Sequence, residues 1–311
     1  MSERVLRGEE LLRPRLGERL RPGFPLAPLT SFRLGGPASL YVEAESSGDL
    51  SAIAVAVEET ELPLLVIGKG SNVLIADAGF PGIVLRLGRS YRWAARDGSR
   101  ITAGGAMPLP ALAGVALAHS LAGLEFGVAI PASLGGSVRM NAGAHGHSLD
   151  EVLDRIEVFR MAGSRTETMP AGDVTFRYRH TELPADAVVV GATVSLSEGD
   201  PVEIRAHMDE ARRWRRETQP LAEPNCGSVF KNPEGDHAAR LIETAGGKAL
   251  SIGGARVSEK HANFIVAGDG STAADVYRLI ETVRDRVEER HGVRLEPEVR
   301  LIGFPGVGDA P

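Results

Sequence analysis

Apolar residues in the first half of the chain come in short runs separated by amphipathic stretches. Glycine, proline or charged residues bound the short runs, which predict strands: "LYVE", "PLLVIG", "NVLIAD" and "GIVLRL", between residues 40 and 87. The stretches 48–60 and 109–123 have the composition and length of helices that connect such strands. After about residue 150 helical spacing fades, and segments 153–161 and 187–199 predict further strands.

The last third of the chain begins with a clear helix signal. Asp200 suits an N-cap, Pro201 the first helical position and Glu203 the third. We expect this helix to end before Gln219-Pro220, because a proline disfavours helical geometry in the residue before it.

A second helix and a strand complete the chain. Within 271–292 five apolar residues fall at i, i+3, i+4, i+7 and i+11, on one helix face: Val276, Leu279, Ile280, Val283 and Val287. The segment 293–303 alternates polar and apolar residues and predicts a strand with Glu298 and Arg300 on one face.

This order of elements predicts an α+β protein with two folded units. We place an N-terminal arm at 1–30, a larger unit at 31–198, a smaller one at 199–303 and a tail at 304–311. The arm is charged and predicts a helix, and its proline-rich end predicts a linker-like break.

Composition narrows the function classes. Of 311 residues 43% are hydrophobic, which is ample for a core, and the formal net charge of −6 argues against general binding to nucleic acid or an anionic membrane. One cysteine excludes an internal disulfide or a multi-cysteine metal centre. The N-terminus lacks a signal-peptide core and no run of about 18 apolar residues occurs, so we expect a cytoplasmic protein.

A glycine-rich loop follows one predicted strand. Residues 68–72, "GKGSN", can turn backbone N–H groups toward a phosphate, because glycine lets the chain approach a ligand closely. A dinucleotide fingerprint would need a third glycine at Val73 and a helix after it, whereas "NVLIAD" continues as a strand. A tight turn between two strands explains this loop equally well.

Small residues dominate a second segment, 127–146, "GVAIPASLGGSVRMNAGAHG". Few side chains would block a flat ligand here, and Ser133, Ser137 and Asn141 offer hydrogen-bonding groups. A small-residue helix packed on a neighbour is the alternative. His145 and His147 are two residues apart without the helical i, i+4 spacing, and we expect no metal there.

Seven runs in this order resemble one family, the UDP-N-acetylenolpyruvoylglucosamine reductases, over about residues 29 to 303. The runs are "TSFRLGGPA", "IGKGSN", "GLEFGVAIPASLGGSVRMNAGAHG", "FRYRHT", "CGSVFKNP", "VSEKHANFIV" and "EPEVRLIG". The family consists of FAD enzymes of peptidoglycan precursor synthesis, and therefore of cell wall biogenesis, cell shape and cell division. The chain is similar to its shorter subclass, which lacks a tyrosine-bearing loop over the substrate.

The resemblance implies an FAD-binding domain of the vanillyl-alcohol-oxidase-like type followed by a smaller α+β substrate domain. It implies noncovalent FAD, because the loop at 68–72 has no histidine or cysteine to anchor a flavin. The residues that it assigns to the cofactor are Arg33, Gly68, Lys69, Gly70, Ser71, Asn72, Pro131, Ala132, Ser133, Gly135, Gly136, Ser137, Asn141, Ala142 and Gly143.

The reaction of this family determines which catalytic groups to look for. Hydride addition to the terminal carbon of an enolpyruvyl ether builds negative charge on the neighbouring carbon and on its carboxylate. A proton donor must then quench that carbon, and hydrogen-bonding or cationic groups must hold the carboxylate. The resemblance assigns the proton to Ser228 in "NCGSVFKNP", where the residue types alone would equally allow a turn-capping serine.

The same resemblance assigns two charged residues to the carboxylate. Arg179 in "FRYRHT" would hold the developing charge, and Glu298 would donate a hydrogen bond as a protonated acid, which requires burial to raise its pKa. Substrate contacts are expected from Tyr178, Asn232 and Arg300. Cys226 is expected to be a small packing residue.

The resemblance implies UDP-N-acetylglucosamine enolpyruvate and NADPH as reactants. It also implies that they use the same cavity in turn, which would explain why no second dinucleotide fingerprint is visible. We expect no nucleic-acid, membrane or obligatory protein partner. Two other readings stay open: an oxidase of the same fold that reoxidises its flavin with oxygen, and a nucleotide-binding protein without turnover.

Overall fold

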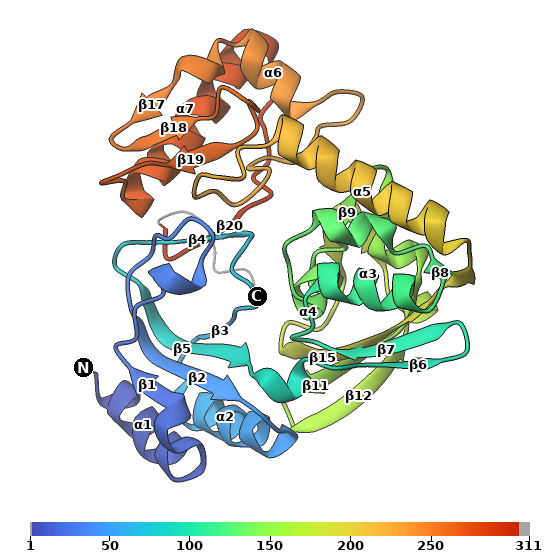
Figure 1. Ribbon diagram of the computed structural model, residues 1–311. Helices are drawn as coiled ribbons and strands as arrows, with labels where there is room; N and C mark the ends of the chain where they lie inside the picture. Colours follow the sequence, from blue (N-terminus) through green and yellow to red (C-terminus); the bar gives the residue numbers. More distant parts are fainter. Residues whose placement is uncertain (1, 305–311) are drawn as a thin grey trace.

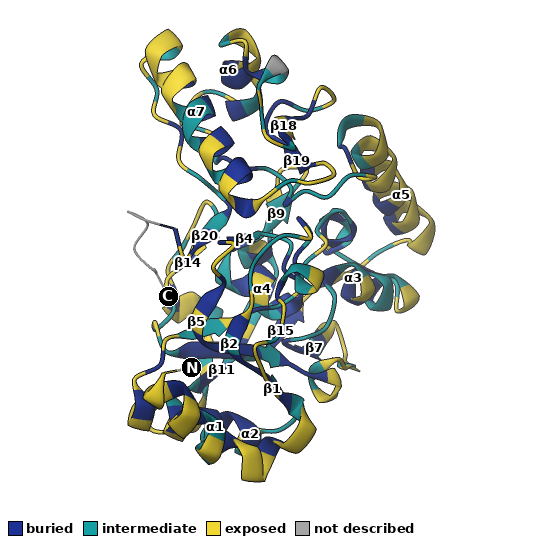
Figure 2. Cartoon of the chain, turned by 90° about the vertical axis from the view of Figure 1, so that its left-hand side faces the viewer, coloured by how far each residue is buried: buried dark blue, intermediate teal, exposed yellow. Residues whose placement is uncertain are grey.

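The computed structural model describes residues 2–304 and arranges them in three groups of elements around a common centre (Figure 1). Most of the predicted tail, 304–311, lies outside the described residues. Exposed residues lie mainly on the outer faces of the peripheral helices, and the central strands are largely buried (Figure 2).

The first group is a four-stranded sheet with two helices. Strands β2, β5 and β3 run parallel, and β1 adds to β2 in the antiparallel sense, in the order β1-β2-β5-β3. Its elements are α1 (Glu3–Leu16), β1 (Leu20–Pro22), β2 (Ala38–Ala44), α2 (Ser47–Thr60), β3 (Leu64–Val66), β4 (Val73–Ile75) and β5 (Phe80–Leu87), with 3-10 turns at Gly17–Arg19 and Ala27–Leu29.

The N-terminal arm belongs to the core of this group. Leu12 on α1 is fully buried in one cluster with Leu50 and Ile53 of α2. The proline-rich stretch that predicts a linker is packed instead: β1 pairs with β2, and Leu26 is fully buried. Helix α1 already ends at its C-cap Gly17, which has a φ of 54°, so the prolines that follow shape only the later turns. The apolar residues between these prolines bind the stretch to the sheet.

The second group is a five-stranded antiparallel sheet in the order β12-β11-β15-β7-β6. Its elements are β6 (Ala94–Asp97), β7 (Arg100–Gly104), α3 (Leu109–Ala118), β8 (Leu121–Ala122), α4 (Leu134–Arg139), β9 (Gly143–Ala144), β10 (His147–Ser148), β11 (Leu153–Arg160), β12 (Arg165–Pro170), β13 (Phe176–Arg177), β14 (His180–Thr181), β15 (Ala187–Ser195) and β16 (Ser197–Glu198). Four 3-10 turns lie at Arg89–Tyr91, Glu125–Ala129, Leu149–Glu151 and Ala171–Asp173.

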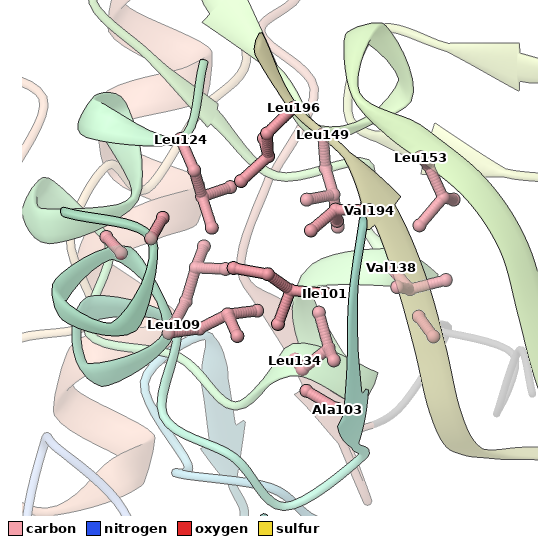
Figure 3. Close-up of a cluster of buried hydrophobic side chains, with 14 of the residues drawn as sticks. Ile101, Ala103, Leu109, Leu124, Leu134, Val138, Leu149, Leu153, Val194 and Leu196 are labelled. Carbon is pink, nitrogen blue, oxygen red and sulfur yellow. The ribbon is translucent and has the colours of Figure 1, made fainter. Parts of the chain in front are cut away.

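Helices α3 and α4 share one core with this sheet. Figure 3 shows side chains of that core converging from helix and strand, among them Leu109 of α3, Leu134 of α4, Ile101 of β7 and Val194 of β15. All four are fully buried, so α4 is packed into the same core as the sheet. This matters because α4 lies inside the small-residue segment that the sequence marks as a ligand wall.

Helix α5 (Pro201–Thr218) packs on the second group, because its buried residues Ile204, Met208 and Ala211 belong to that core. It leads to the third group, whose elements are α6 (Ala238–Thr244), β17 (Ser251–Ile252), β18 (Ala255–Val257), β19 (Ile265–Ala267), α7 (Ala273–His291) and β20 (Arg300–Ile302), with a 3-10 turn at Gly247–Ala249. The predicted face of α7 is buried from Val276 to Val287. Asp200 caps α5 as predicted, since its side chain accepts from the N–H of Val202 at 2.8 Å.

The C-terminal strand leaves its own group and pairs with the first. Strand β20 runs parallel to β4, with Arg300 opposite Val73 and Ile302 opposite Ile75. Figure 1 shows this pair at the centre of the molecule. Only three residues of the predicted strand 293–303 pair in this way, because the preceding residues, around Pro297, form only an isolated bridge to Phe230.

Two other predicted elements are shorter in the structure. The helix predicted at 109–123 ends at Ala118, and Leu121 starts the short strand β8 after Ser120 takes a left-handed φ of 54°. The strand predicted at 187–199 ends at Ser195 as β15, and Ser197–Glu198 form the separate short strand β16.

We predict that Asp77→Ala lowers the free energy of unfolding by about 1 kcal/mol. The Asp77 carboxylate accepts from the N–H groups of Ala273 and Ala274, each at 2.9 Å, and so caps α7 from a loop far away in sequence. Urea unfolding followed by circular dichroism measures the loss. Asp97→Ala, at the exposed end of β6, should leave stability within about 0.5 kcal/mol, and equal losses in both variants would contradict the capping role.

Candidate active site

One cavity of about 1290 Å³ is lined by residues from all three groups. Ligand sites commonly measure about 300–1,000 Å³, so this cavity has room for more than one ligand of ordinary size. Its walls are the loop 68–72, the segment around α4, the start of β15, the last turn of α5 and turns of the third group.

Most of the predicted site residues line this cavity although they come from distant parts of the sequence. They are Gly68, Lys69, Gly70, Ser71, Asn72, Pro131, Ala132, Ser133, Gly135, Gly136, Ser137, Ala142, Gly143, Tyr178, Arg179, Ser228, Asn232, Glu298 and Arg300.

Two residues predicted to bind the cofactor do not line it. Arg33 is exposed outside the cavity. Asn141 is buried, and its side chain is used within the protein: it donates to the carbonyl of Arg177 at 3.3 Å and accepts from the N–H of Asp150 at 3.1 Å. Asn141 therefore shapes the wall from behind, and this placement does not support a direct cofactor contact for either residue.

The loop 68–72 requires its glycines. Gly70 has a φ of 61°, and a Cβ there would lie 1.9 Å from the carbonyl oxygen of Leu29. A Cβ on Gly68 would lie 2.3 Å from Oγ of Ser133, the N-cap of α4. The backbone of the loop 68–72 thus packs against the side chain of Ser133 in the second glycine-rich segment. Any larger residue at Gly68 would push the two segments apart.

Ser137 on α4 supplies an observation that points to a ligand. Ser137 is among the residues that line the cavity, and its Oγ is buried without a hydrogen-bond partner within residues 2–304. A buried hydroxyl without a partner costs about 1–3 kcal/mol, and a polar ligand in the cavity would remove that cost. A glycine-walled cradle with such a hydroxyl fits FAD.

Arg179 reaches the cavity from the tip of a hairpin. Strands β13 and β14 pair Arg177 with His180, so Tyr178 and Arg179 form a two-residue turn. Arg179 takes a left-handed φ of 57°, a conformation that costs a non-glycine residue about 1 kcal/mol or more. Contacts at the tip offset that cost: its Nη2 donates to the carbonyl of Gly143 at 2.8 Å, and its Cζ lies 4.9 Å from the ring centre of Tyr178.

Glu298 is the partner of Arg179. Arg179 Nε donates to Glu298 Oε1 at 3.0 Å, and the two side chains are only 20% and 16% exposed. Burial raises the pKa of Glu298, and the nearby Arg179 acts in the opposite direction without cancelling that rise. A carboxyl group with a raised pKa can keep its proton and donate a hydrogen bond, as its predicted role requires.

Ser228 is followed directly by a segment that Asn263 holds in place. Asn263 binds it with three hydrogen bonds: its carbonyl accepts from the N–H of Val229, and its side chain bonds both the N–H and the carbonyl of Phe230, at 2.8–2.9 Å. Gly227 precedes the serine with a φ of 82°. Cys226 is 5% exposed and burial raises the pKa of its thiol, which agrees with a packing role.

The residues expected to contact the substrate surround this segment. Asn232 Oδ1 accepts from the N–H of Ala238 at the start of α6, at 3.1 Å, which orients its amide. Tyr178 is 51% exposed at the tip of its hairpin. Burial lowers the pKa of the Arg300 guanidinium on the polar face of β20.

Sequence inspection missed several cavity residues: Arg139, Trp214, Arg215, His261 and Asn263. Arg139 donates to three backbone carbonyls, those of Leu183, Pro184 and Ala187, at 3.1–3.5 Å. Arg139 lies on a short helix and Asn263 lies before a strand. Nothing in the residues around either one shows that it lines a cavity formed with residues some 40 or more positions away in the sequence. Only the "KHANFIV" run hinted at His261 and Asn263.

Comparison with known proteins bears on this site. The family model for the C-terminal domain of UDP-N-acetylenolpyruvoylglucosamine reductase matches residues 219–302, and a model for an FAD binding domain matches 38–168. The chain is 44% identical over 284 residues to a UDP-N-acetylenolpyruvoylglucosamine reductase of Heliobacterium modesticaldum, covering 91% of this chain and 90% of that protein. It is also 44% identical over 287 residues to one from Anaeromyxobacter sp. strain Fw109-5, covering 92% and 89%.

A solved structure agrees with these matches. The crystal structure of UDP-N-acetylenolpyruvylglucosamine reductase from Thermus caldophilus superposes with a TM-score of 0.78 at 32% identity, covering 91% of this chain and 98% of that one. None of the described helices has both the length and the apolar character needed to cross a bilayer.

We predict that Ser137→Ala weakens FAD binding by about tenfold while it leaves the apoprotein equally or more stable. The hydroxyl has no partner within the described chain, so its removal costs the apoprotein nothing, but it takes one hydrogen bond of about 0.5–1.5 kcal/mol from a bound ligand. Equilibrium titration of apoprotein with FAD and thermal unfolding measure the two effects.

Ser271→Ala is the matched control, since Ser271 Oγ is also buried without a partner in the described residues but lies outside the cavity. It should change stability in the same direction and leave FAD affinity unchanged. Unaltered FAD affinity in Ser137→Ala would remove Ser137 from the cofactor site.

Proposed function

The chain belongs to the UDP-N-acetylenolpyruvoylglucosamine reductase family, and from this premise we propose that it reduces the enolpyruvyl group of UDP-N-acetylglucosamine enolpyruvate to give UDP-N-acetylmuramate. The resemblance predicted from the sequence is thereby confirmed, and so is the α+β class with an FAD-binding domain. The observation that carries the proposal is that Arg179, Ser228 and Glu298, from three separate segments, line one glycine-walled cavity.

FAD, when bound and reduced by NADPH, supplies a hydride to the terminal carbon of the substrate double bond. The rest of the work falls to side chains of the protein. Negative charge that develops on the adjacent carbon spreads into its carboxylate, and the cavity must stabilise it there. The reaction is complete when that carbon accepts a proton.

We assign the carboxylate to Arg179 and Glu298. Two contacts hold the guanidinium, through Nε and Nη2, and its remaining N–H groups can donate to a substrate carboxylate. Glu298, with its pKa raised by burial, can present a protonated oxygen to the same group. Both donors are in place before the substrate arrives, so little reorganisation is needed as charge develops.

We assign the proton to the Ser228 hydroxyl. A hydroxyl is a weak acid, but a carbon with carbanion character is a strong base, so transfer is favourable once charge has built up there. The asparagine clamp at Asn263 fixes the backbone on the C-terminal side of Ser228, which limits the positions that the hydroxyl can reach.

The division of labour along the chain is also a proposal. Residues 31–198 would bind FAD, residues 199–303 would bind the sugar nucleotide, and 1–30 would complete the first core. Tyr178, Asn232 and Arg300 would contact the substrate. A cytoplasmic location is part of the same proposal, because it suits a precursor reaction of peptidoglycan synthesis.

A spectroscopic experiment tests the function. The purified protein should carry a flavin spectrum that NADPH bleaches without oxygen and that UDP-N-acetylglucosamine enolpyruvate restores. Restoration by oxygen alone would favour an oxidase, and binding of the sugar nucleotide without any bleaching would favour a protein without turnover.

We predict that Ser228→Ala separates the two half-reactions. Bleaching by NADPH should proceed at a normal rate, whereas reoxidation by the enolpyruvyl substrate should slow by about 10²–10⁴-fold, the usual contribution of a positioned proton donor. Anaerobic stopped-flow absorbance measures both steps. Ser228→Cys keeps a proton donor and should be less affected, and Cys226→Ala should leave both steps within a few fold. Normal reoxidation in Ser228→Ala would exclude this residue as the donor.

We predict that kcat/KM for the enolpyruvyl substrate falls as pH rises through the raised pKa of Glu298. Only the protonated carboxyl group can donate a hydrogen bond, and its ionised form repels the substrate carboxylate. Glu298→Gln keeps a donor at every pH and should lose this alkaline decline. Glu296→Gln, at an exposed neighbour that pairs with Lys231, should keep it. An unchanged decline in Glu298→Gln would assign the titration to another group.

A further inference from the structure

The side chain of Asn72 is hydrogen-bonded to the C-terminal strand at the point where the glycine loop meets it. Asn72 Nδ2 donates to the backbone carbonyl of Glu298 at 3.1 Å, although the two residues are 226 positions apart in the sequence. The backbone carbonyl of Asn72 accepts from the N–H of Arg300, also at 3.1 Å. One residue of the loop 68–72 therefore holds the backbone of the last strand on both sides of Val299.

The bond from the Asn72 amide supplies a partner that strand pairing does not. Strand β20 begins at Arg300, opposite Val73, so Glu298 comes before the paired residues. The Asn72 amide satisfies the Glu298 carbonyl in place of a neighbouring strand. The N–H of Glu298 donates to the carbonyl of Val229 at 2.7 Å. Both backbone polar groups of Glu298 are thus fixed, one from the glycine loop and one from the residue after Ser228.

The placement of this backbone determines what the Glu298 carboxyl group can reach. Its Oε1 accepts from Arg179 Nε at 3.0 Å, and the side chain is only 16% exposed. Under the proposed function, Glu298 and Arg179 must both reach the carboxylate of one substrate molecule. An error of about 1 Å in the placement of a reacting or binding group can slow a reaction about 100-fold.

The glycine loop can bind a phosphate without the Asn72 side chain. Such loops use their backbone N–H groups for this purpose, and Gly68 and Gly70 allow the close approach that it requires. Asn72 lines the cavity, but its amide already donates to the C-terminal strand. A role at Glu298 and a role at the cofactor therefore predict different losses when the amide is removed.

We propose that Asn72 is a positioning residue for Glu298, whose backbone it fixes so that the carboxyl group meets the substrate carboxylate together with Arg179. This inference rests on the proposed function for the identity of the substrate. It assigns the Asn72 side chain to the second half of the reaction, in which the enolpyruvyl group is reduced. The loop 68–72 then serves the cofactor through its backbone and the substrate through one side chain.

Anaerobic stopped-flow absorbance of Asn72→Ala, with each half-reaction measured separately, tests the proposal. Reoxidation of the reduced flavin by the enolpyruvyl substrate should slow by about 10- to 100-fold at saturating substrate, because the carboxylate gains charge only as the reaction proceeds. Bleaching by NADPH and the dissociation constant of FAD, from titration of the apoprotein, should stay within about threefold, because both depend on the loop backbone.

Asp77→Ala is the matched control. Asp77 also joins the first group to the third, by capping α7, but it does not contact Glu298. Its removal should lower stability in urea and leave both half-reactions within about threefold, since it only loosens a distant cap. Equal slowing of reoxidation in Asp77→Ala and Asn72→Ala would overturn the proposal, because general loosening would then explain both. Asn72→Gln keeps an amide on a longer side chain and should show a smaller loss, which provides the test if Asn72→Ala does not fold.

A double-mutant cycle determines whether Asn72 acts through Glu298. When Glu298→Ala is already present, Asn72→Ala should slow reoxidation by no more than about twofold further, because the group that it positions is absent. Fully additive losses would overturn the proposal. A fall in FAD affinity large enough to account for the slower reoxidation would also overturn it and would assign the Asn72 amide to the cofactor.

The failure of this proposal can be told apart from the failure of the proposed function. If the enolpyruvyl substrate does not reoxidise the flavin of the parent protein, the proposed function is wrong, and the positioning role is wrong with it. If the parent protein turns over and Asn72→Ala is reoxidised as fast as Asp77→Ala, the function remains and only the positioning role is wrong.

Discussion

The hydrogen-bonded contact between Arg179 and Glu298 holds the centre of this molecule together. Arg179 also binds the carbonyl of Gly143, and the Glu298 backbone binds the carbonyl of Val229 through its N–H and the amide of Asn72 through its carbonyl. Five segments therefore meet at two residues. Removing either side chain would leave a largely buried polar group of the other without its partner, which destabilises the protein by more than the contact itself contributes.

This junction explains why β20 pairs with β4 of the first group and not with the sheet of its own group. Strand β20 pairs with β4 so that Arg300 lies opposite Val73, the residue directly after the glycine loop. Glu298 lies two residues before Arg300. The N–H of Arg300 then donates to the carbonyl of Asn72 in the loop 68–72, and the side-chain amide of Asn72 donates to the carbonyl of Glu298. Asp77 strengthens the same connection from the other end of β4 by capping α7. This site forms only when β20, near the C-terminus, pairs with β4 in the first group. Its folding therefore depends on contacts between residues far apart in the sequence.

Elements that depend mainly on neighbouring residues, such as helices and tight loops, were predicted from local features of the sequence. The caps and apolar spacing of α5 and α7 gave both helices to within a residue or two, and the loop 68–72 was placed correctly between strands. The segment 293–303 is a strand only in its last part. The alternation of polar and apolar residues indicates which side chains are buried, but a strand also needs a partner strand, and only the last part has one. Arg215 and Asn263 escaped notice because their roles come from neighbours more than 30 residues away. The resemblance placed Arg33 and Asn141 at the cofactor, but Asn141 is occupied by its own fold.

Arginines on the cavity wall differ in what already holds them. Arg139 is occupied by the carbonyls of Leu183, Pro184 and Ala187, so it ties parts of the wall together. Arg179 is held by Glu298 and by the carbonyl of Gly143, which fixes its guanidinium and leaves further N–H groups for a ligand. Attraction between a largely buried guanidinium and an anion is stronger than in bulk water, but burying the cation costs free energy before the anion arrives. Under the proposed function the substrate carboxylate is the anion that offsets this cost at Arg179.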